Sequence, residues 1–159
     1  MNQEAFEKVL RISEEFFGTA SDPDQMPINQ ESADKLQSIH PETISYKCDE
    51  QQHPIAWTVV VPTSVDVMKQ FIHKKISEKE LLDLATKEKK FESIYLCGIF
   101  VLPEFRRKGY ATEIVKEAIS KVSQGNNLPL YSWAYSPEGQ KLLHALSQEL
   151  KQKIMVLQD

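Results

Sequence analysis

Apolar side chains recur at helical spacing in the first twenty residues of the chain. Gly18 follows the last aromatic residue, and glycine is favoured just beyond a helix end because it adopts positive φ without strain. The spacing therefore predicts a first helix that ends at Gly18. Residues 19–28 hold two prolines and two aspartates, which is typical of a turn-rich connection, and a second short helix is predicted over 29–39. The apolar stripe of the first helix comprises Phe6, Val9, Leu10, Ser13, Phe16 and Phe17.

The hydrophobic period then changes to that of strands. Residues 43–48 alternate, and residues 55–61 are rich in β-branched side chains, so the two segments predict a hairpin. Residues 62–90 have helical patterning again, with Thr63 as the expected N-cap of one helix and a capping box in the next. That box is formed by Ser77 and Glu80. The pattern assigns no function to this insertion.

The strongest strand pattern covers residues 91–102 and is interrupted by Gly98, which indicates a bulge or a close approach of another backbone. After a short basic segment, six apolar positions between Ala111 and Val122 follow one face of a helix. A strand over 130–135, a helix opened by Ser136 and Pro137, and a strand over 154–157 complete the chain. This order predicts a mixed α/β fold in one domain spanning residues 1–159.

Composition and charge narrow the classes of partner. The chain has 159 residues, of which 41% are hydrophobic and 26% charged, as in ordinary globular proteins. A net charge of −4 and a pI of about 5.6 disfavour nucleic acid. The N-terminal residues do not resemble a signal, and no apolar run is long enough for a membrane helix. Because Cys48 and Cys97 are not spaced as a redox or metal pair, we expect a cytoplasmic protein with reduced thiols and no metal.

Glycine is scarce, with five residues, and no GxGxxG or GxxxxGK[ST] motif is present, which excludes the two commonest nucleotide-binding loops. One segment still has features that favour the binding of an anion. In GIFVLPEFRRKGYATEIV a strand runs through a proline turn into a helix preceded by Arg106, Arg107 and Lys108. Cations at a helix N-terminus oppose the helix dipole unless an anion such as a polyphosphate is bound there. A solvated basic turn is the alternative interpretation.

This segment resembles the signature of the GNAT superfamily of acyl-CoA-dependent N-acetyltransferases, which is a strand, V-x-P and then [QR]-x-x-G-x-[GA]. Every defining position matches. The order of elements extends the resemblance over about residues 45–146, and its specific part is the twenty residues around the loop. The resemblance implies a central, mostly antiparallel sheet with splayed fourth and fifth strands, flanked by helices. The matching residues are Val101-Leu102-Pro103 followed by Arg106-Arg107-Lys108-Gly109-Tyr110-Ala111.

The resemblance also implies a site for acetyl-CoA as co-substrate. Main-chain N–H groups and basic side chains of the loop would bind the pyrophosphate of coenzyme A. The pantetheine arm would pair with exposed backbone of the fourth strand at Ile99, Phe100 and Val101. Ser136 would replace an asparagine that many members have, and Gly139 would lie beside the pantetheine arm. The loop residues implied in phosphate binding are Arg106, Arg107, Lys108, Gly109, Tyr110, Ala111 and Thr112.

The implied reaction is direct attack by a primary amine on the thioester, which needs a base for the amine and is helped by an acid for the departing thiolate. Many members use a tyrosine as the acid, but this chain has Leu143 there. The candidate substitutes are His144, Tyr131 and Tyr135, of which Tyr135 is favoured because it ends the fifth strand. The alternative is that these residues have packing or surface roles. A thiolate also leaves without a dedicated acid, because it is a reasonably stable anion at neutral pH.

Glu92 is the expected base, since it precedes the bulge and burial there would raise its pKa into a useful range. The alternative is a solvated glutamate at a strand end. Cys97 is interpreted as a buried thiol and not as a nucleophile, because its strand is apolar and no histidine lies near in sequence.

Three functions fit these features. The first is an N-acetyltransferase that acts on a small-molecule or peptide amine, and the second is a catalytically inactive, CoA-binding regulatory module. The third is an α/β interaction domain without a ligand. The chain lacks the strand with which the family usually opens and has one of its two usual final strands, so a partner subunit in a homodimer could cover the sheet edge. The sequence does not name the acceptor.

Overall fold

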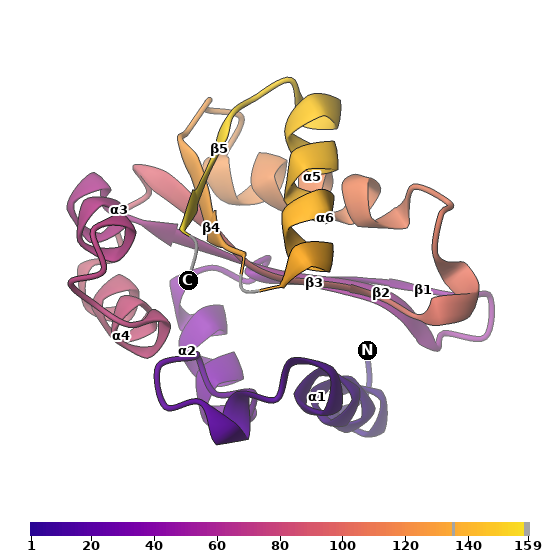
Figure 1. The fold of residues 1–159 in the computed structure, drawn as a ribbon. Helices are drawn as coiled ribbons and strands as arrows, with labels where there is room; N and C mark the ends of the chain where they lie inside the picture. The colour runs from indigo at the N-terminus through magenta and orange to yellow at the C-terminus, as the bar shows by residue number, and fades with distance from the viewer. Residues whose placement is uncertain (135, 158–159) are drawn as a thin grey trace.

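The protein is built on a five-stranded sheet with helices on both faces, as the computed structural model in Figure 1 shows. The structure describes residues 1–134 and 136–157. The strands are adjacent in the order in which they follow along the chain. They are β1 (Ile44–Cys48), β2 (Pro54–Thr63), β3 (Ser93–Val101), β4 (Leu130–Trp133) and β5 (Ile154–Leu157).

The sheet is mixed. β1, β2 and β3 form an antiparallel meander, whereas β3, β4 and β5 run parallel to one another. The antiparallel ladders are the longer ones, in agreement with a mostly antiparallel sheet. The family usually opens with a strand before its first helix, whereas β1, the first strand among the described residues, follows α2. β3 and β4 therefore correspond to the strands that the resemblance numbers fourth and fifth.

Among the described residues, six α-helices cover the two faces (Figure 1). α5 and α6 pack on the face that carries Ala56 and Leu96. α2, α3 and α4 pack on the opposite face against Tyr95, and α1 packs there against Trp57. None of the described helices is both long and apolar enough to cross a membrane. The helices are α1 (Gln3–Phe17), α2 (Gln30–Ile39), α3 (Val65–Ile72), α4 (Glu78–Glu88), α5 (Tyr110–Ser123) and α6 (Pro137–Leu150), with 3₁₀ turns η1 (Thr19–Ser21) and η2 (Pro103–Phe105).

Local sequence signals explain most helix ends. Gly18 ends α1 in the left-handed conformation with φ 64°, and its N–H donates to the carbonyl of Glu14. The predicted capping box of Ser77 is present at the start of α4. The prediction for α3 was wrong by one residue. Ser64 caps that helix, because Thr63 belongs to β2 and its hydroxyl lies in a buried hydrogen-bonded cluster.

The feature that positions the site is a split between β3 and β4. In the β2–β3 ladder Val59 is opposite Gly98 and Val60 is opposite Leu96, so Cys97 is an extra residue that bulges out of β3. The bulge predicted near Gly98 is therefore confirmed. β3 pairs with β4 only as far as Leu96, yet it continues to Val101. Beyond the bulge the two strands are unpaired within the described residues, which matches the implied splay.

Candidate active site

The N-terminus of α5 differs from that of every other described α-helix. Gly109 occupies its N-cap position with φ 81° and supplies no side-chain cap. The first-turn N–H groups of an α-helix have no partner within the helix, so an uncapped start leaves them available to an external acceptor. The other five helices are capped by a side-chain oxygen of Asn2, Asn29, Ser64, Ser77 or Ser136.

Three exposed cations surround this helix start. Arg106, Arg107 and Lys108 form no ion pair with any described residue. Arg107 has φ 63°, which a non-glycine residue adopts only at a steric cost, so the loop is turned sharply just before the helix. An uncapped helix start beside three unpaired cations is a suitable site for a polyphosphate.

The free edge of β3 begins beside this loop. The N–H of Leu102 donates to Ile55 in β2, and backbone groups alternate in direction along a strand. The N–H and C=O groups of Ile99 and Val101 therefore point away from β2 into the split. Those of Phe100 face β2, so of the three residues expected to pair with the pantetheine arm, Phe100 is excluded.

Three contacts define the surroundings of this edge. The Nε of Arg106 donates to the carbonyl of Val101 at 2.9 Å, so a side chain of the phosphate loop reaches the strand edge. On the α1 side, the Phe100 ring stacks on Trp57 and meets the ring of Phe16 edge-on at 5.0 Å. Phe16 is 58% exposed, although it is aromatic.

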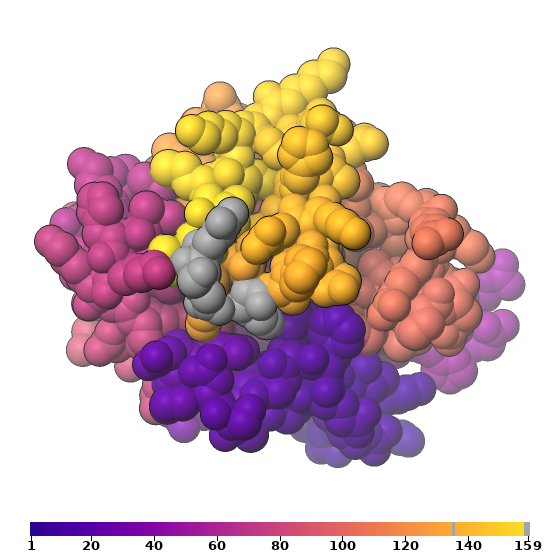
Figure 2. All heavy atoms as spheres, in the orientation of Figure 1, coloured from indigo at the N-terminus to yellow at the C-terminus, as the bar shows by residue number. Residues whose placement is uncertain are grey.

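A cavity of about 340 Å³ fills the split between β3 and β4. It lies where the end of α1 meets the start of α6, a seam that Figure 2 shows from outside between the indigo and orange segments. Ser136 lines this cavity, but its Oγ already accepts a hydrogen bond from the N–H of Gly139. The cavity is also lined by Phe17, Cys97, Gly98, Trp133 and Leu143.

A family comparison agrees with this geometry. The family model described as acetyltransferase (GNAT) family matches residues 7–142. The chain belongs to the GNAT acetyltransferase family. No curated protein and no solved structure matches it.

The structure argues against Glu92 as the base of this acetyltransferase-family chain. Its side chain is exposed, and its Oε1 accepts a long hydrogen bond of 3.4 Å from the N–H of Val65 at the start of α3. It precedes the first residue of β3, whereas the split opens beyond Leu96. The burial on which the predicted role depended is absent.

The residues considered as the acid lie in different environments. Tyr135 lies outside the described residues. Tyr131 is fully buried, its hydroxyl is 2.6 Å from the Oγ1 of Thr63, and burial raises its pKa, so it is held away from the cavity. His144 is exposed and contacts Gln148, which agrees with a surface role. Leu143 is 6% exposed and lines the cavity, so apolar surface replaces a proton donor there.

Cys97 occupies the bulge and lines the cavity, which makes its protonation state important. Burial raises the pKa of this thiol well above its usual value, and the neighbouring Glu78 carboxylate adds to the shift. The thiol is therefore neutral and a poor nucleophile at neutral pH, as its sequence context predicted.

The residue that sequence reasoning missed is Glu78 at the start of α4. It is 5% exposed, one carboxylate oxygen accepts from the N–H of Met26 at 2.7 Å, and the other accepts from the hydroxyl of Tyr95. Burial raises the pKa of Glu78 to about 7, although both hydrogen bonds act in the opposite direction. A signal was present, because Glu78 precedes Leu81, Leu82 and Ala85 by three, four and seven residues, the spacing of one buried helix face.

Proposed function

We propose that this protein is an N-acetyltransferase that moves an acetyl group from acetyl-CoA to a primary amine by direct attack. The observation that carries the proposal is that the loop before the uncapped start of α5 reaches the free edge of β3 through Arg106. An elongated molecule with a phosphate at one end and amide groups along its length fits such a continuous surface. Coenzyme A has this form, and when bound it supplies an activated thioester.

Each part of the surface has a role in this proposal. The N–H groups of Tyr110, Ala111 and Thr112 would hold the pyrophosphate, with the three cations of the loop beside it. The backbone groups of Ile99 and Val101 would pair with the pantetheine arm as a neighbouring strand would. The thioester would then lie in the cavity between β3 and β4.

Arg106 links the two parts. Its hydrogen bond to the carbonyl of Val101 occupies the acceptor that the pantetheine arm would need. Pairing at that carbonyl would release the guanidinium, which is then free to bind a phosphate. Phosphate and strand edge would therefore be occupied together.

An inactive CoA-binding module is the second candidate. It is supported by Leu143, which lines the cavity where the family's usual acid would stand, and by the exposure of Glu92. Both candidates require acetyl-CoA to bind. They differ in whether an amine releases the thiol of coenzyme A.

The test combines a thermal shift assay with a thiol-release assay. At acetyl-CoA concentrations of about 100 times Kd, the free energy of unfolding rises by roughly 2.7 kcal/mol, which corresponds to about 5–10 °C in Tm. We expect this shift, and thiol release when a primary amine is added. Absence of the shift contradicts both candidates, whereas a shift without thiol release from any amine leaves the regulatory module.

Two glycine variants provide a matched comparison. Gly109 and Gly125 have φ of 81° and 79°, and an added Cβ would meet nothing within 4 Å at either position. Gly109→Ala and Gly125→Ala therefore introduce similar backbone strain, about 1 kcal/mol. We expect only Gly109→Ala to weaken acetyl-CoA binding, because only Gly109 lies at the proposed phosphate site. Equal affinities would contradict that placement.

A further inference from the structure

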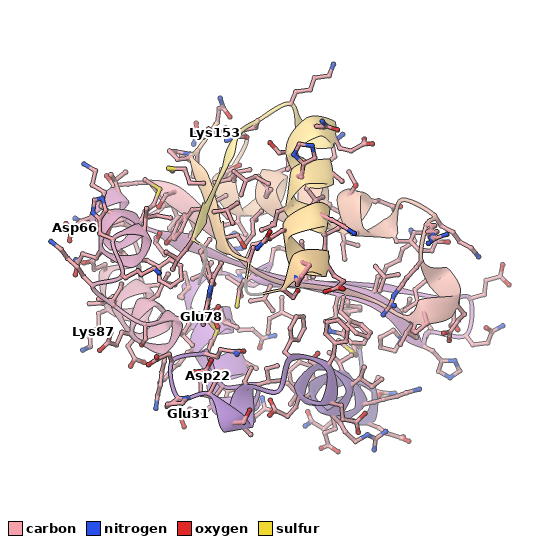
Figure 3. The ribbon with its side chains drawn as sticks, in the orientation of Figure 1. Asp22, Glu31, Asp66, Glu78, Lys87 and Lys153 are labelled. Atoms are coloured by element: carbon pink, nitrogen blue, oxygen red, sulfur yellow. The ribbon has the colours of Figure 1, made fainter. Side chains whose placement is uncertain are left out.

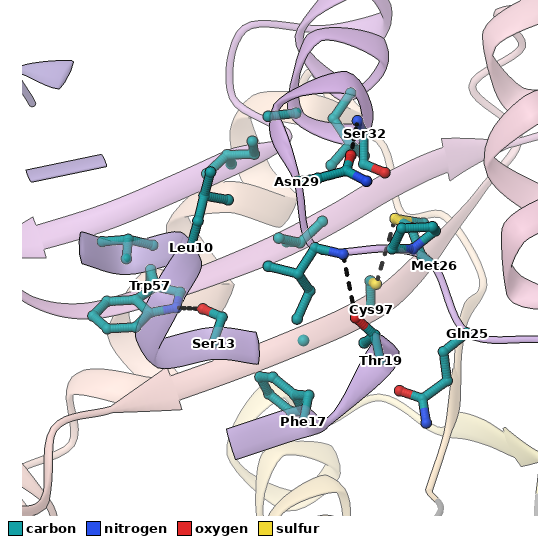
Figure 4. Close-up of a pocket in the computed structure, with 18 of the residues that line it drawn as sticks. Leu10, Ser13, Phe17, Thr19, Gln25, Met26, Asn29, Ser32, Trp57 and Cys97 are labelled. Carbon is teal, nitrogen blue, oxygen red and sulfur yellow. Dashed lines mark hydrogen bonds between the residues drawn. The ribbon is translucent and has the colours of Figure 1, made fainter. Parts of the chain in front are cut away.

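A second, smaller cavity adjoins the cavity between β3 and β4 and lies between α1, α2 and the sheet (Figure 4). Its volume is about 90 Å³, and it shares Phe17, Cys97 and Gly98 with the cavity between β3 and β4. Two of its three hydroxyl groups are already used, since Ser13 accepts from the Nε1 of Trp57 and Thr19 accepts from the N–H of Ile28. The remaining lining is mainly hydrocarbon, including Phe6, Val9, Leu10, Met26, Ile28, Ala33 and Leu36.

Glu78 is the only charged residue among those that line this smaller cavity. Figure 3 shows it between the helices and the sheet, whereas the labelled Asp66 and Lys87 lie at the periphery. Its carboxylate accepts two hydrogen bonds but has about four acceptor positions. It forms no ion pair within the part of the chain that the structure describes.

Glu78 also adjoins a third cavity, of about 330 Å³, which is lined by Trp133. Trp133 in turn lines the cavity between β3 and β4. Glu78 therefore lines both the smaller cavity and the third cavity, and each of these shares lining residues with the cavity proposed for the thioester. The titratable groups around it are Tyr95 and Cys97 from β3, Asp22 and Asp24 from the segment before α2, Lys74 and Lys75 from the turn before α4, and Glu80 from α4.

We propose that the acceptor is a small, apolar primary amine whose ammonium group is received by Glu78 and whose hydrocarbon chain enters the smaller cavity. The inference rests on the proposed acetyl transfer and specifies its substrate class. A buried carboxylate without a cationic partner is a suitable site for an ammonium group.

The size and lining of the cavity limit the rest of the acceptor. A volume of about 90 Å³ is smaller than the roughly 150 Å³ that receives benzene, so it accommodates a chain of a few carbons. A second charge on that chain would be buried without a partner, which is unfavourable. Diamines and amino acids are therefore excluded, and short alkyl amines are favoured.

The proton balance follows from this placement. The ammonium group gives one proton to Glu78, and the neutral amine attacks the thioester carbon as the C–S bond breaks. The second proton leaves the nitrogen when the amide forms and neutralises the thiolate, and Glu78 later releases its proton to water. Burial raises the pKa of Glu78 to about 7, which is close to the optimum for a base that acts at neutral pH.

The experiment compares three primary amines with four-carbon chains: butylamine, diaminobutane and aminobutyrate. They share a reacting nitrogen and differ at the far end, which is a methyl group, an ammonium group or a carboxylate. We expect butylamine to give the highest kcat/KM for thiol release, at least tenfold above the other two. Equal rates, or preference for a charged chain, overturn the assignment of the substrate class.

Glu78→Gln tests the carboxylate, with Glu80→Gln as the matched control. The glutamine amide can accept from Met26 and donate to Tyr95, so both internal hydrogen bonds have a replacement. Glu80 lines the same third cavity but is exposed, and glutamine preserves its capping box. We expect Glu78→Gln to lower kcat/KM for butylamine by about 100-fold or more and Glu80→Gln to leave it within twofold. Equal effects overturn the role of Glu78.

The pH profile separates catalysis from a structural role. With Glu78 as base, kcat/KM rises with pH and levels off above about pH 7. In Glu78→Gln only the free amine reacts, so kcat/KM continues to rise tenfold per pH unit towards the amine pKa of about 10. A plateau in both proteins assigns Glu78 a structural role and contradicts the proposal.

Binding provides a readout that does not depend on turnover. Butylamine added to the complex with CoA should raise the Tm of the wild type but not of Glu78→Gln, while both proteins keep their response to acetyl-CoA. If acetyl-CoA does not raise the Tm of the wild type, the proposed function itself is refuted. A normal acetyl-CoA response without any effect of butylamine refutes only the acceptor assignment.

Discussion

Replacing Glu78 by glutamine should stabilise the protein at neutral and alkaline pH, although it removes a buried charged group. Burial raises the pKa of this carboxyl from its ordinary value of 4.5 to about 7. Below the ordinary value the group is protonated in both the folded and unfolded states and has no pH-dependent effect. Between the two values the folded state keeps a proton that the unfolded state has lost, so stability falls as pH rises.

The magnitude follows from the size of the shift. A difference of about 2.5 units between the two states corresponds to roughly 3 kcal/mol, at about 1.4 kcal/mol per unit. This destabilisation is complete above about pH 7 and absent below the ordinary pKa. Glutamine does not ionise, so the stability of Glu78→Gln relative to the wild type should increase by roughly 2 to 3 kcal/mol between pH 5 and pH 8.

Urea unfolding of both proteins at several pH values measures this difference directly. Other titrating groups affect both proteins alike and cancel in the comparison. Glu80→Gln removes an exposed carboxylate from the same helix turn and should show no such dependence. A difference between Glu78→Gln and wild type that stays constant from pH 5 to pH 8 would refute the argument that burial dominates at Glu78.

Three further predictions concern other parts of the site. Ala33 is buried against the smaller cavity, so Ala33→Leu should fill it and lower kcat/KM for butylamine at least tenfold, while the thermal shift with acetyl-CoA stays unchanged. Unchanged butylamine kinetics would place the acceptor elsewhere. Lys108→Gln should raise the Kd for acetyl-CoA by about two- to fivefold at low salt and less at high salt, whereas Lys116→Gln, within α5, should not. Equal effects of the two lysine variants in a titration would argue against a local phosphate contact. Ser77→Ala removes the hydrogen bond from the N–H of Glu80 and should lower the free energy of urea unfolding by about 1 kcal/mol; no loss would show that the capping box does not stabilise α4.

The parts of the site that the sequence predicted depend on local geometry. The loop before Gly109 and the bulge beside Gly98 follow from residues within a few positions of each other, and the structure contains both features. Phe100 required more information, because the direction of its backbone groups depends on the register with β2. Local pattern alone does not determine a register.

The prediction of the catalytic base shows more clearly what local sequence pattern cannot determine. Glu92 was chosen because it is close in sequence to the bulge, yet the strand carries it away from the split. Glu78 is about twenty residues from the bulge but is folded back against β3 through Tyr95. Helical periodicity could have placed Glu78 on a buried face, whereas the identity of the surface that buries it depends on tertiary packing.

The insertion that carries α3 and α4 can now be given a physical role. The first residue of α4 is a carboxylate that would benefit from the helix dipole if it were exposed, and two hydrogen bonds also favour its ionised form. Burial nevertheless raises its pKa, so packing is the stronger effect at this position. A leucine or glutamine there would avoid this destabilisation. A buried carboxylate that lines the mainly apolar smaller cavity and lowers the stability of the fold is typical of a functional site. The acceptor chemistry should therefore be tested on Glu78 and not on the exposed Glu92.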